Sequence, residues 1–512
     1  MTLVDSPPKG SKRVPYRSAL CVYPHLDGLP EKKYCPPIGL EYIATVLKGL
    51  VETVTLVDMR FEPDIDALIA RYEVDLLCVC VNWDYQHAAA VAVASKVHPG
   101  VAVVFGGRYA TTSVDKLFAQ TPQLDIVVRG DGEEIVREIA SGIPLRDITG
   151  ISYRENGGVV HNKIRTLTQL DDSILPDRKL RRTDYRLLYK NLDLGLVVDF
   201  VSTSRGCPFS CKFCTFSNNP MGEKRPWSGR SAASVVAELK TVDAKFVFVV
   251  DDNFGVDMKR VSQICDLILA EGIRKTFAVA VRVEIYRHPE ILKKMFRAGF
   301  KILTIGIESA QDKTLKAMNK GFDTALAKKA LAVIRKAGFY IHGYFIVGSI
   351  GEDEAEMLAI ASFAERLKLD TIDLSLLRTE EFSPLNAIVA ERGNYHILAQ
   401  GNVVSDEYDL DRLKAIRRRI RREYYTARSA LRIGASIFRT RLISLRALLK
   451  LSFFFVFKGL GSRRRDAKAG ARSPASGGGT AGNGRRGPLP EPLPGDEPIR
   501  EPALVEEVAS DR

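Results

Sequence analysis

The stretch DFVSTSRGCPFSCKFCTFS, residues 199–217, places an apolar strand pattern directly before three closely spaced cysteines. These are Cys207, Cys211 and Cys214, three of only eight cysteines in a chain of 512 residues. Thiolates so close together on one loop are typical of metal ligation. A structural zinc site needs four closed ligands, whereas this loop supplies three and the sequence holds no second CxxC pair.

Three thiolates suit an iron–sulfur cluster, because such clusters are held by cysteine. A [4Fe–4S] cluster with three cysteine ligands keeps one iron open, and an open position distinguishes a catalytic metal site from a structural one. The alternative is a zinc ion completed by His342, which predicts a colourless binding protein without catalysis. We favour a [4Fe–4S] cluster on Cys207, Cys211 and Cys214.

The bulk composition is ordinary for a soluble globular protein, with 46% hydrophobic and 27% charged residues. The length predicts two or three domains. No apolar signal segment opens the sequence and cysteines are few, so we expect a cytoplasmic protein. The net charge of +13 is concentrated between Arg412 and Arg465, where 17 Lys and Arg stand against one acidic residue, Glu423.

Strand and helix patterns alternate through residues 15–165, with continuous apolar strands such as TVTLVDMR and DLLCVCVN. This alternation predicts a doubly wound parallel sheet, which binds its ligand at the carboxyl ends of the strands. Three successive predicted strands end in polar or glycine residues, namely Asn82, Gly106, Gly107, Gly130 and Gly132. We expect a ligand crevice there, although tight turns that need glycine explain any one of these positions.

A linker at residues 166–195 leads to a second series of strands and helices at 196–400. Six strand patterns, each followed by a helix, predict an α/β fold with a partial or full (β/α) barrel. Catalytic groups of such barrels lie at the carboxyl ends of the strands, where the cysteine loop falls. A basic helical region at 401–460 and a Gly- and Pro-rich tail at 461–512, predicted to be disordered, complete the chain.

The CxxxCxxC loop after the first barrel strand resembles the radical S-adenosylmethionine (SAM) superfamily. The resemblance implies that SAM binds the open iron and that an electron from the cluster cleaves it to methionine and a 5′-deoxyadenosyl radical. The resemblance assigns SAM binding to residues at the strand ends: Phe213, Asp251, Asp252, Asn253, Arg282, Glu284, Gly306 and Glu308. For Asp251 and Asp252 the alternative is a structural role, in which their carboxylates cap the start of a helix.

The first series resembles the cobalamin-binding domain that precedes the barrel in one large branch of this superfamily. That branch includes hopanoid methylases and the magnesium-protoporphyrin oxidative cyclase, and the two resemblances together cover roughly residues 15–400. The DxHxxG motif, whose histidine ligates cobalt in many cobalamin proteins, is missing, and His25 does not fit it. The branch commonly lacks this histidine, so the resemblance still implies cobalamin at the glycine-rich strand ends.

The resemblance implies cobalamin-dependent methylation of an unactivated carbon of a small or lipid-like metabolite, with a reducing partner such as flavodoxin or ferredoxin. The alternative is a radical cyclisation or rearrangement, with or without cobalamin. Two interpretations stay open for the basic segment 412–465: peripheral contact with the inner face of a membrane, or a helical cap on the barrel. Nucleic-acid binding is the least favoured.

Overall fold

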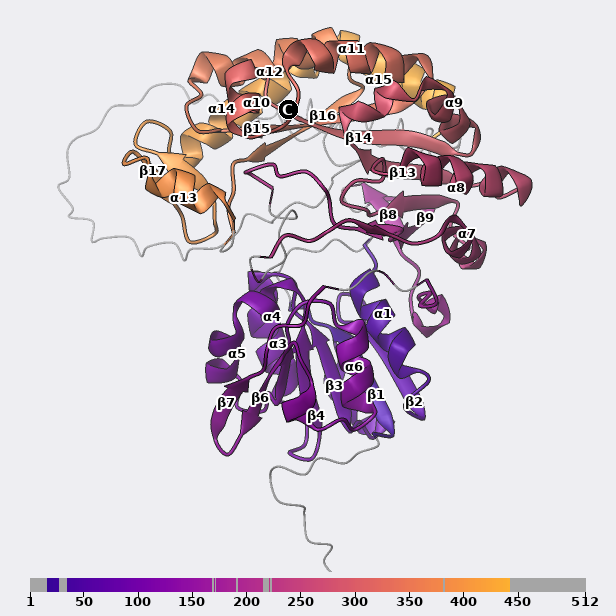
Figure 1. Cartoon of the computed structure of the whole chain (residues 1–512), viewed down its shortest axis with the longest axis vertical. Helices are drawn as coiled ribbons and strands as arrows, with labels where there is room; N and C mark the ends of the chain where they lie inside the picture. Colours follow the sequence, from indigo (N-terminus) through magenta and orange to yellow (C-terminus); the bar gives the residue numbers. More distant parts are fainter. Residues whose placement is uncertain are drawn as a thin grey trace, which may run out of the picture.

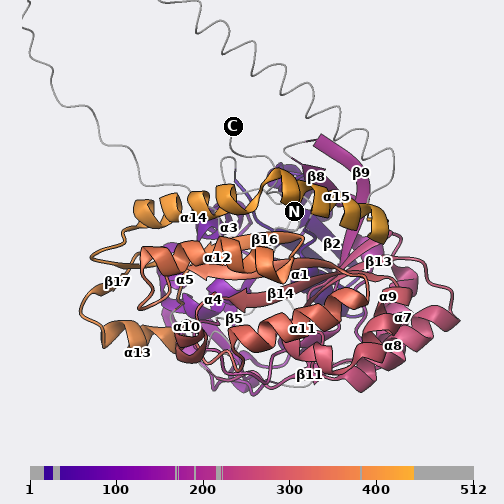
Figure 2. The same ribbon diagram turned by 90° about the horizontal axis from the view of Figure 1, so that it is seen from above.

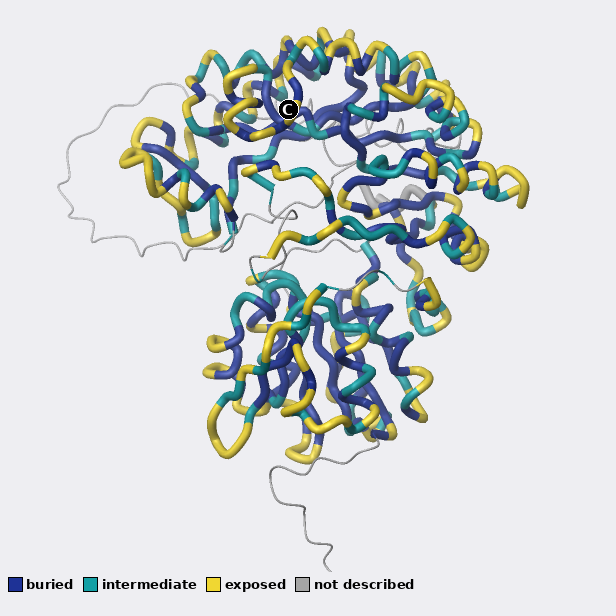
Figure 3. The backbone as a smooth tube through the Cα atoms, viewed as in Figure 1, coloured by how far each residue is buried: buried dark blue, intermediate teal, exposed yellow. Residues whose placement is uncertain are grey.

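The computed structural model describes residues 16–442 apart from 27–34, 168–169, 171, 190–191, 215–220, 222 and 381–382. Two seven-stranded sheets, one in each half of the chain, are each flanked by helices (Figure 1). Their strands form the buried interior of both halves (Figure 3). The predicted disordered tail and the part of the basic region beyond residue 442 lie outside the described residues. Within the described ranges, no helix has the length and apolar character that crossing a membrane requires.

The N-terminal sheet has seven strands in the order β2-β1-β3-β4-β5-β6-β7. Its first five strands are parallel and bury apolar side chains on both faces, which confirms the predicted doubly wound sheet. They are β1 (Ser18–Tyr23), β2 (Thr53–Asp58), β3 (Leu76–Cys80), β4 (Ala102–Gly106) and β5 (Ile126–Val128).

Helices cover both faces of this sheet. One face carries α1 (Ile38–Leu47) and α6 (Glu133–Ala140). The opposite face carries α2 (Ile65–Tyr72), α3 (His87–Ala94), α4 (Arg108–Thr112) and α5 (Val114–Gln120). The two short helices α4 and α5 were not predicted from the sequence.

An antiparallel hairpin extends the sheet and was also missed. It consists of β6 (Ile151–Glu155) and β7 (Gly158–His161). Asn156 and Gly157, between the two strands, both have positive φ angles, of 49° and 83°. Asn-Gly with positive φ at both positions is a strong signal for a tight hairpin turn, so the sequence did contain the clue.

The second sheet has the order β16-β15-β14-β13-β12-β9-β8, with β16 and β8 as its two edges among the described strands. The sheet is therefore a partial barrel, one of the two forms that the sequence allowed. Its six parallel strands are β9 (Leu192–Val201), β12 (Phe246–Val249), β13 (Thr276–Val281), β14 (Phe300–Glu308), β15 (Tyr340–Val347) and β16 (Thr371–Leu376). The antiparallel strand β8 (Arg186–Tyr189) lies inside the predicted linker.

The helices that alternate with the strands cover the outer face of the barrel sheet, as the view from above shows (Figure 2). Alternate strand residues, such as Val279 and Ile305, face these helices in one large apolar core. The helices are α7 (Ala232–Thr241), α8 (Met258–Ala270), α9 (Pro289–Arg297), α11 (Thr324–Lys336) and α12 (Glu354–Leu367). Short elements on the loops are β10 (Ser204–Arg205), β11 (Ser228–Gly229), α10 (Asp312–Ala317), α13 (Leu385–Ala390), β17 (Tyr395–Ile397) and β18 (Val403–Ser405).

Two C-terminal helices, α14 (Leu410–Tyr424) and α15 (Ala427–Thr440), end the described chain. The apolar face of α14, with Leu413, Ile416 and Ile420, packs into the barrel core. These residues recur at helical spacing, so one stripe of the helix is buried while most of its arginines stay at the surface. The described part of the basic region therefore packs on the barrel. The domain boundaries at residues 165, 195 and 400 stay predictions.

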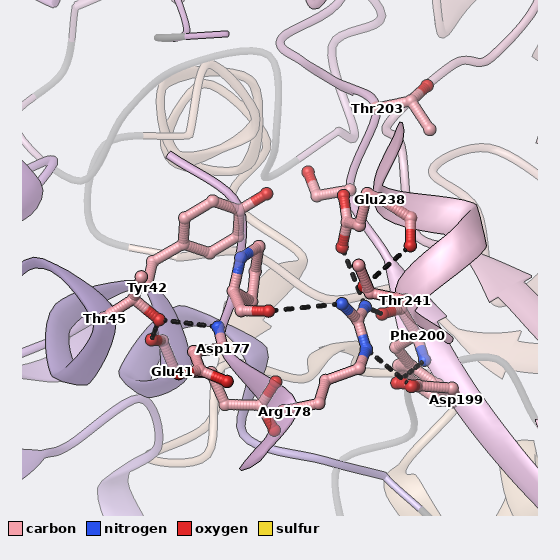
Figure 4. A network of polar contacts seen from close by, with 12 residues as sticks. Glu41, Tyr42, Thr45, Asp177, Arg178, Asp199, Phe200, Thr203, Glu238 and Thr241 are labelled. Atoms are coloured by element: carbon pink, nitrogen blue, oxygen red, sulfur yellow. Dashed lines mark hydrogen bonds and ion pairs between the residues drawn. The ribbon is translucent and has the colours of Figure 1, made fainter. Parts of the chain in front are cut away.

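A buried ionic network joins the two halves. Arg181 donates to both carboxylate oxygens of Glu41 on α1, at 2.7 and 2.8 Å, and to Asp199 on β9 at 2.7 Å. Arg178 donates to Asp199 at 2.6 Å and to Glu238 on α7 at 2.7 Å (Figure 4). Glu41 and Glu238 have fully buried side chains. The charge of Glu41 depends on Arg181, whereas Glu238 is shared by Arg178 and the buried Arg230 of its own half.

We predict that Arg181→Met lowers the free energy of unfolding by about 3 kcal/mol, because it leaves buried carboxylates without their cation. Urea denaturation followed by circular dichroism measures this loss. Lys240→Met is the matched control, since Lys240 and Glu271 form a half-exposed pair. Its loss should stay below about 1 kcal/mol. Equal stability of the two variants would show that the network does not hold the halves together.

Candidate functional site

The cysteine loop starts directly after β10, at the carboxyl end of β9. Cys211 is buried, Cys207 and Cys214 are half-buried, and none forms a disulfide. The backbone N–H of Cys214 donates to the carbonyl of Cys211 at 3.1 Å, which forms a turn between the two ligands. The N–H of Lys212 donates to the carbonyl of Met318 at 3.0 Å and ties the loop to the segment after α10.

The described residues contain no group of three Cys, His, Asp or Glu side chains already placed as a metal site. The fit of the loop to a cluster rests on its donor set, which is three reduced thiols on one turn at the carboxyl end of a barrel strand. Burial raises the pKa of the Cys207 thiol, while the nearby cation of Arg282 lowers it. The cation thus offsets part of the rise in the pKa of Cys207 that burial causes.

Two aspartates at the end of β12 hold the base of this loop. The buried carboxylate of Asp251 accepts hydrogen bonds from the N–H of Thr203 at 2.6 Å and from the hydroxyls of Thr203 and Ser204 at 2.5 and 2.6 Å. Asp252 accepts from the N–H of Gly206 at 2.7 Å, one residue before Cys207. Burial raises the pKa of both carboxyls, against the effect of these hydrogen bonds.

The capping alternative for these two aspartates is wrong. The N-cap of α8 is Asp257, which accepts from the N–H of Arg260 at 3.0 Å. Asn253 is buried, and its side-chain oxygen accepts from the N–H of Gly255 at 3.3 Å, within its own turn. Binding of SAM by Asp251, Asp252 and Asn253 stays a prediction, and the observed contacts of Asp251 are to β9 and its loop.

Arg282 lies beside the cysteine loop at the end of β13. Its guanidinium stacks on Phe209, 3.7 Å from the ring centre, and Nη1 lies 3.4 Å from Sγ of Cys211. Nη2 donates to Glu284 at 2.8 Å and to the carbonyl of Lys320. The side chain is buried and held from several sides, so its position next to Cys211 is fixed.

Glu308 and Lys320 form a buried ion pair of 2.7 Å at the end of β14. Glu308 has a positive φ of 71°, an unusual conformation for a residue other than glycine. A Cβ at Gly306 would lie 2.3 Å from Oε1 of Glu308, so glycine leaves room for the pair. Lys320 also lies over the ring of Phe213, 5.4 Å from its centre.

Lys320 thus links three predicted SAM residues, Phe213, Arg282 and Glu308, around the cysteine loop. Sequence reasoning missed it, because Lys320 follows α10 in a segment without a recognisable strand end. The spacing of twelve residues from Glu308 gives no local signal that the two meet.

A cavity of about 460 Å³ lies where the two halves face each other. Its lining includes all five residues predicted for cobalamin, at the carboxyl ends of β3, β4 and β5: Asn82, Gly106, Gly107, Gly130 and Gly132. The barrel contributes Ser202, Ser204, Arg205 and Asp252 to the same cavity. The predicted crevice is therefore a real cavity, and it reaches the residues that precede the cysteine loop.

The glycines of this cavity show both roles that the sequence allowed. Gly107 has a φ of 109°, and a Cβ there would lie 2.7 Å from the carbonyl oxygen of Val81 and from Oδ1 of Asn82, so the turn itself requires glycine. Gly106 has open space toward the cavity, since its nearest neighbour to an added Cβ is Val128 at 3.7 Å. A bulky cofactor can approach the backbone closely at such a glycine-lined wall.

Ion pairs bridge the two halves at the rim of the cavity. Arg205, just before the cysteine loop, donates to Glu133 at the start of α6. Arg225 pairs with Asp131, and Arg108 pairs with Glu380 beyond the barrel strands. In the stretch RGDGEE, the glycines were the residues predicted from the sequence to be functional. The acidic residues Asp131 and Glu133 of the same stretch make the contacts between the halves.

Comparisons with known proteins match each half of the chain to a protein family. Residues 201–364 match the radical SAM superfamily, and residues 31–140 match the B12 binding domain. An uncharacterised methyltransferase of Pyrococcus horikoshii is 30% identical over 358 residues, which cover 65% of this chain and 74% of that protein. An anaerobic magnesium-protoporphyrin IX monomethyl ester cyclase of Cereibacter sphaeroides is 26% identical, and the match covers 57% of this chain and about half (49%) of that enzyme.

The fold is similar to that of a solved radical SAM methyltransferase, TsrM from Kitasatospora setae with cobalamin and a [4Fe–4S] cluster bound. The TM-score is 0.59 at 18% identity, and the match covers 73% of this chain and 78% of TsrM. The chain belongs to the B12-binding radical SAM superfamily. It is a cobalamin-dependent radical SAM enzyme whose cofactors are a [4Fe–4S] cluster, SAM and cobalamin, as the sequence predicted.

We predict that Cys211→Ala abolishes cluster binding and SAM cleavage, because two thiolates cannot hold the cluster. Iron and sulfide per chain, together with 5′-deoxyadenosine formation, measure the effect. Cys265→Ala is the control, since Cys265 is buried inside α8 away from the loop; it should keep the cluster and cost about 1 kcal/mol of stability. SAM cleavage retained in Cys211→Ala would contradict the assignment.

We predict that Arg282→Gln makes the cluster harder to reduce in the absence of SAM, because a cation and an N–H donor beside a ligand sulfur stabilise the reduced cluster. The expected shift is on the order of 50 mV, or about 1 kcal/mol for one electron. Redox titration followed by electron paramagnetic resonance measures it. Arg287→Gln removes an exposed charge nearby and should leave the potential unchanged. An unchanged reduction potential in Arg282→Gln, together with weaker SAM binding, would show that Arg282 binds SAM and does not tune the cluster.

Proposed function

We propose that this enzyme methylates an unactivated carbon of a small or lipid-like metabolite, with cobalamin as methyl carrier. The observation that supports this proposal is the shared cavity. Gly106 and Gly107 line it from the cobalamin-binding side, and Ser204 and Arg205, which lead into the cysteine loop, line it from the barrel side. A methyl carrier and a radical source must reach the same substrate carbon, and one cavity between both cofactor sites meets that need.

When bound, the cluster and SAM supply the radical and cobalamin carries the methyl group. The chain itself contributes positioning. Cys207, Cys211 and Cys214 would hold three irons, and Asp251 and Asp252 fix the base of their loop through the hydrogen bonds to Thr203, Ser204 and Gly206.

The buried charges around the loop would orient SAM. Lys320 and Arg282 are cations suited to its carboxylate, and Glu308 and Glu284 are acceptors suited to its amino or ribose groups. The rim ion pairs of Arg205 and Arg225 hold the two halves against each other and narrow the way for water into the cavity.

An external reductant must supply the electron, and we propose a flavodoxin or ferredoxin. Exposed Lys212, within the cysteine loop, and exposed Lys224, which donates to the hydroxyl of Ser210 at 2.9 Å, give this side of the loop positive charge. Such charge favours a carrier with an acidic surface.

The test is transfer of a deuterated methyl group from SAM to a metabolite, using anaerobically reconstituted enzyme and a metabolite extract. We predict a labelled product together with S-adenosylhomocysteine and 5′-deoxyadenosine. Formation of 5′-deoxyadenosine without label transfer and without S-adenosylhomocysteine would contradict methylation and favour a cyclisation or rearrangement, in line with the cyclase relatives.

Gly106→Leu is the variant that tests the cavity itself, because its side chain would project into the space at the carboxyl end of β4. Cobalamin bound per chain should fall at least about tenfold, and label transfer with it. Gly100→Leu, at the opposite end of the same strand, meets only the ring of His98 at 3.8 Å and should bind cobalamin normally. Normal cobalamin binding by Gly106→Leu would place the cofactor elsewhere.

A further inference from the structure

Helix α15 exposes large apolar side chains to solvent. Leu431 is 78% exposed and Phe438 is 87% exposed, the highest values among the large hydrophobic residues of the described chain. The two residues are seven positions apart, which places them on the same side of the helix two turns from each other. Three small exposed residues, Ala427, Gly434 and Ala435, lie on the same side of the helix. We call these five residues the α15 apolar face: Ala427, Leu431, Gly434, Ala435 and Phe438.

The opposite side of α15 fixes the direction in which this face points. Ile433 and Ile437 pack into the apolar cluster at the bottom of the barrel, together with Tyr340 at the start of β15. Arg432 donates to the carbonyl of Leu369 at 2.7 Å and to Glu365 at 2.9 Å, and Arg439 donates to the carbonyl of Gly338 at 3.2 Å. The helix is therefore anchored, and its apolar face is directed outward.

Basic residues frame the α15 apolar face. Residues 412–442 contain 11 Lys and Arg against a single acidic residue, Glu423. Arg428 and Arg441 are exposed on α15 or at its end, and Arg418 and Arg422 are exposed on α14. The two helices follow each other along one edge of the molecule (Figure 2). Arginines thus flank the α15 apolar face at both ends of the helix and continue along α14, with Arg428 also 3.9 Å from Glu365.

We propose that the α15 apolar face docks on the surface of an anionic lipid bilayer. Such a surface meets both features at once, because it accepts apolar side chains below its headgroups and attracts arginine with its negative charge. A nucleic acid would use the arginines but offer nothing to Leu431. A second copy of the chain would bring a surface of the same positive charge against this one.

The position of α15 suits such contact. It packs at the amino-terminal ends of the barrel strands, whereas the cysteine loop follows the carboxyl end of β9. Docking through α15 would leave the cofactor end of the barrel directed away from the bilayer.

Sedimentation of the full-length protein with lipid vesicles tests the proposal. Vesicles of phosphatidylcholine with phosphatidylglycerol should bind the protein, and vesicles of phosphatidylcholine alone should bind it much more weakly. Leu431→Glu/Phe438→Glu should lower the partition coefficient about tenfold or more, because two apolar anchors are lost. Leu431→Ser/Phe438→Ser, which adds no charge, should lower it in the same direction.

Ile143→Glu/Leu269→Glu is the matched control, since both residues are exposed hydrophobics on other elements and the change in charge is equal. It should bind as the unmodified protein does. Circular dichroism and iron per chain check that each variant is folded. Unchanged vesicle binding by the α15 variants, an equal loss in the control, or equal binding to neutral vesicles would each overturn the proposal. So would a dimer in light scattering that the α15 variants dissociate without any vesicle binding.

Discussion

The buried network of Arg178 and Arg181 is the interaction on which the arrangement of this enzyme depends. Glu41 and Asp199 are buried in opposite halves and share Arg181, while Arg178 bonds to Asp199 and Glu238, the latter also paired with the buried Arg230. The forked guanidinium groups of Arg178 and Arg181 bond in several directions at once, so they fix orientation as well as charge. The carboxyl ends of β3 to β5 and the residues before the cysteine loop consequently line one cavity.

Within that frame, the charges of the site position the protein's own loops. Asp251 and Asp252 hold the end of β9 just before Cys207, and Arg282 is clamped between Phe209, Glu284 and the backbone of Lys320 beside Cys211. Burying charged groups costs free energy unless they are paired, so such a cluster is better explained by function than by stability. It surrounds the cysteines with groups of both signs.

The strands and the cysteine loop could be predicted from the sequence, because each depends on a short continuous stretch of residues. Apolar patterns such as DLLCVCVN and KFVFVVDDN each correspond to a parallel strand. The spacing of Cys207, Cys211 and Cys214 indicated an iron–sulfur cluster. The contacts of Lys320 and of the arginine network could not be predicted, because the partners lie 12 to 140 residues away in the sequence. A linker rich in charged residues is also expected to lie at the surface rather than to be buried. The hairpin β6–β7 was missed although Asn156 and Gly157 signalled its turn. The role of Asp251 needed the fold, because only the pairing of β12 with β9 brings it under Thr203.

In the arrangement we propose, cobalamin and the iron–sulfur cluster occupy two sides of one cavity between the sheets. The most direct measurement is a crystal structure of the protein loaded anaerobically with both cofactors, with anomalous diffraction recorded at the cobalt and iron edges. We expect one cobalt peak in the cavity beside Gly106 and Gly107, and one iron peak at Cys207, Cys211 and Cys214 facing it. A cobalt peak outside this cavity, or two halves that separate so that the peaks no longer share it, would rule out this arrangement.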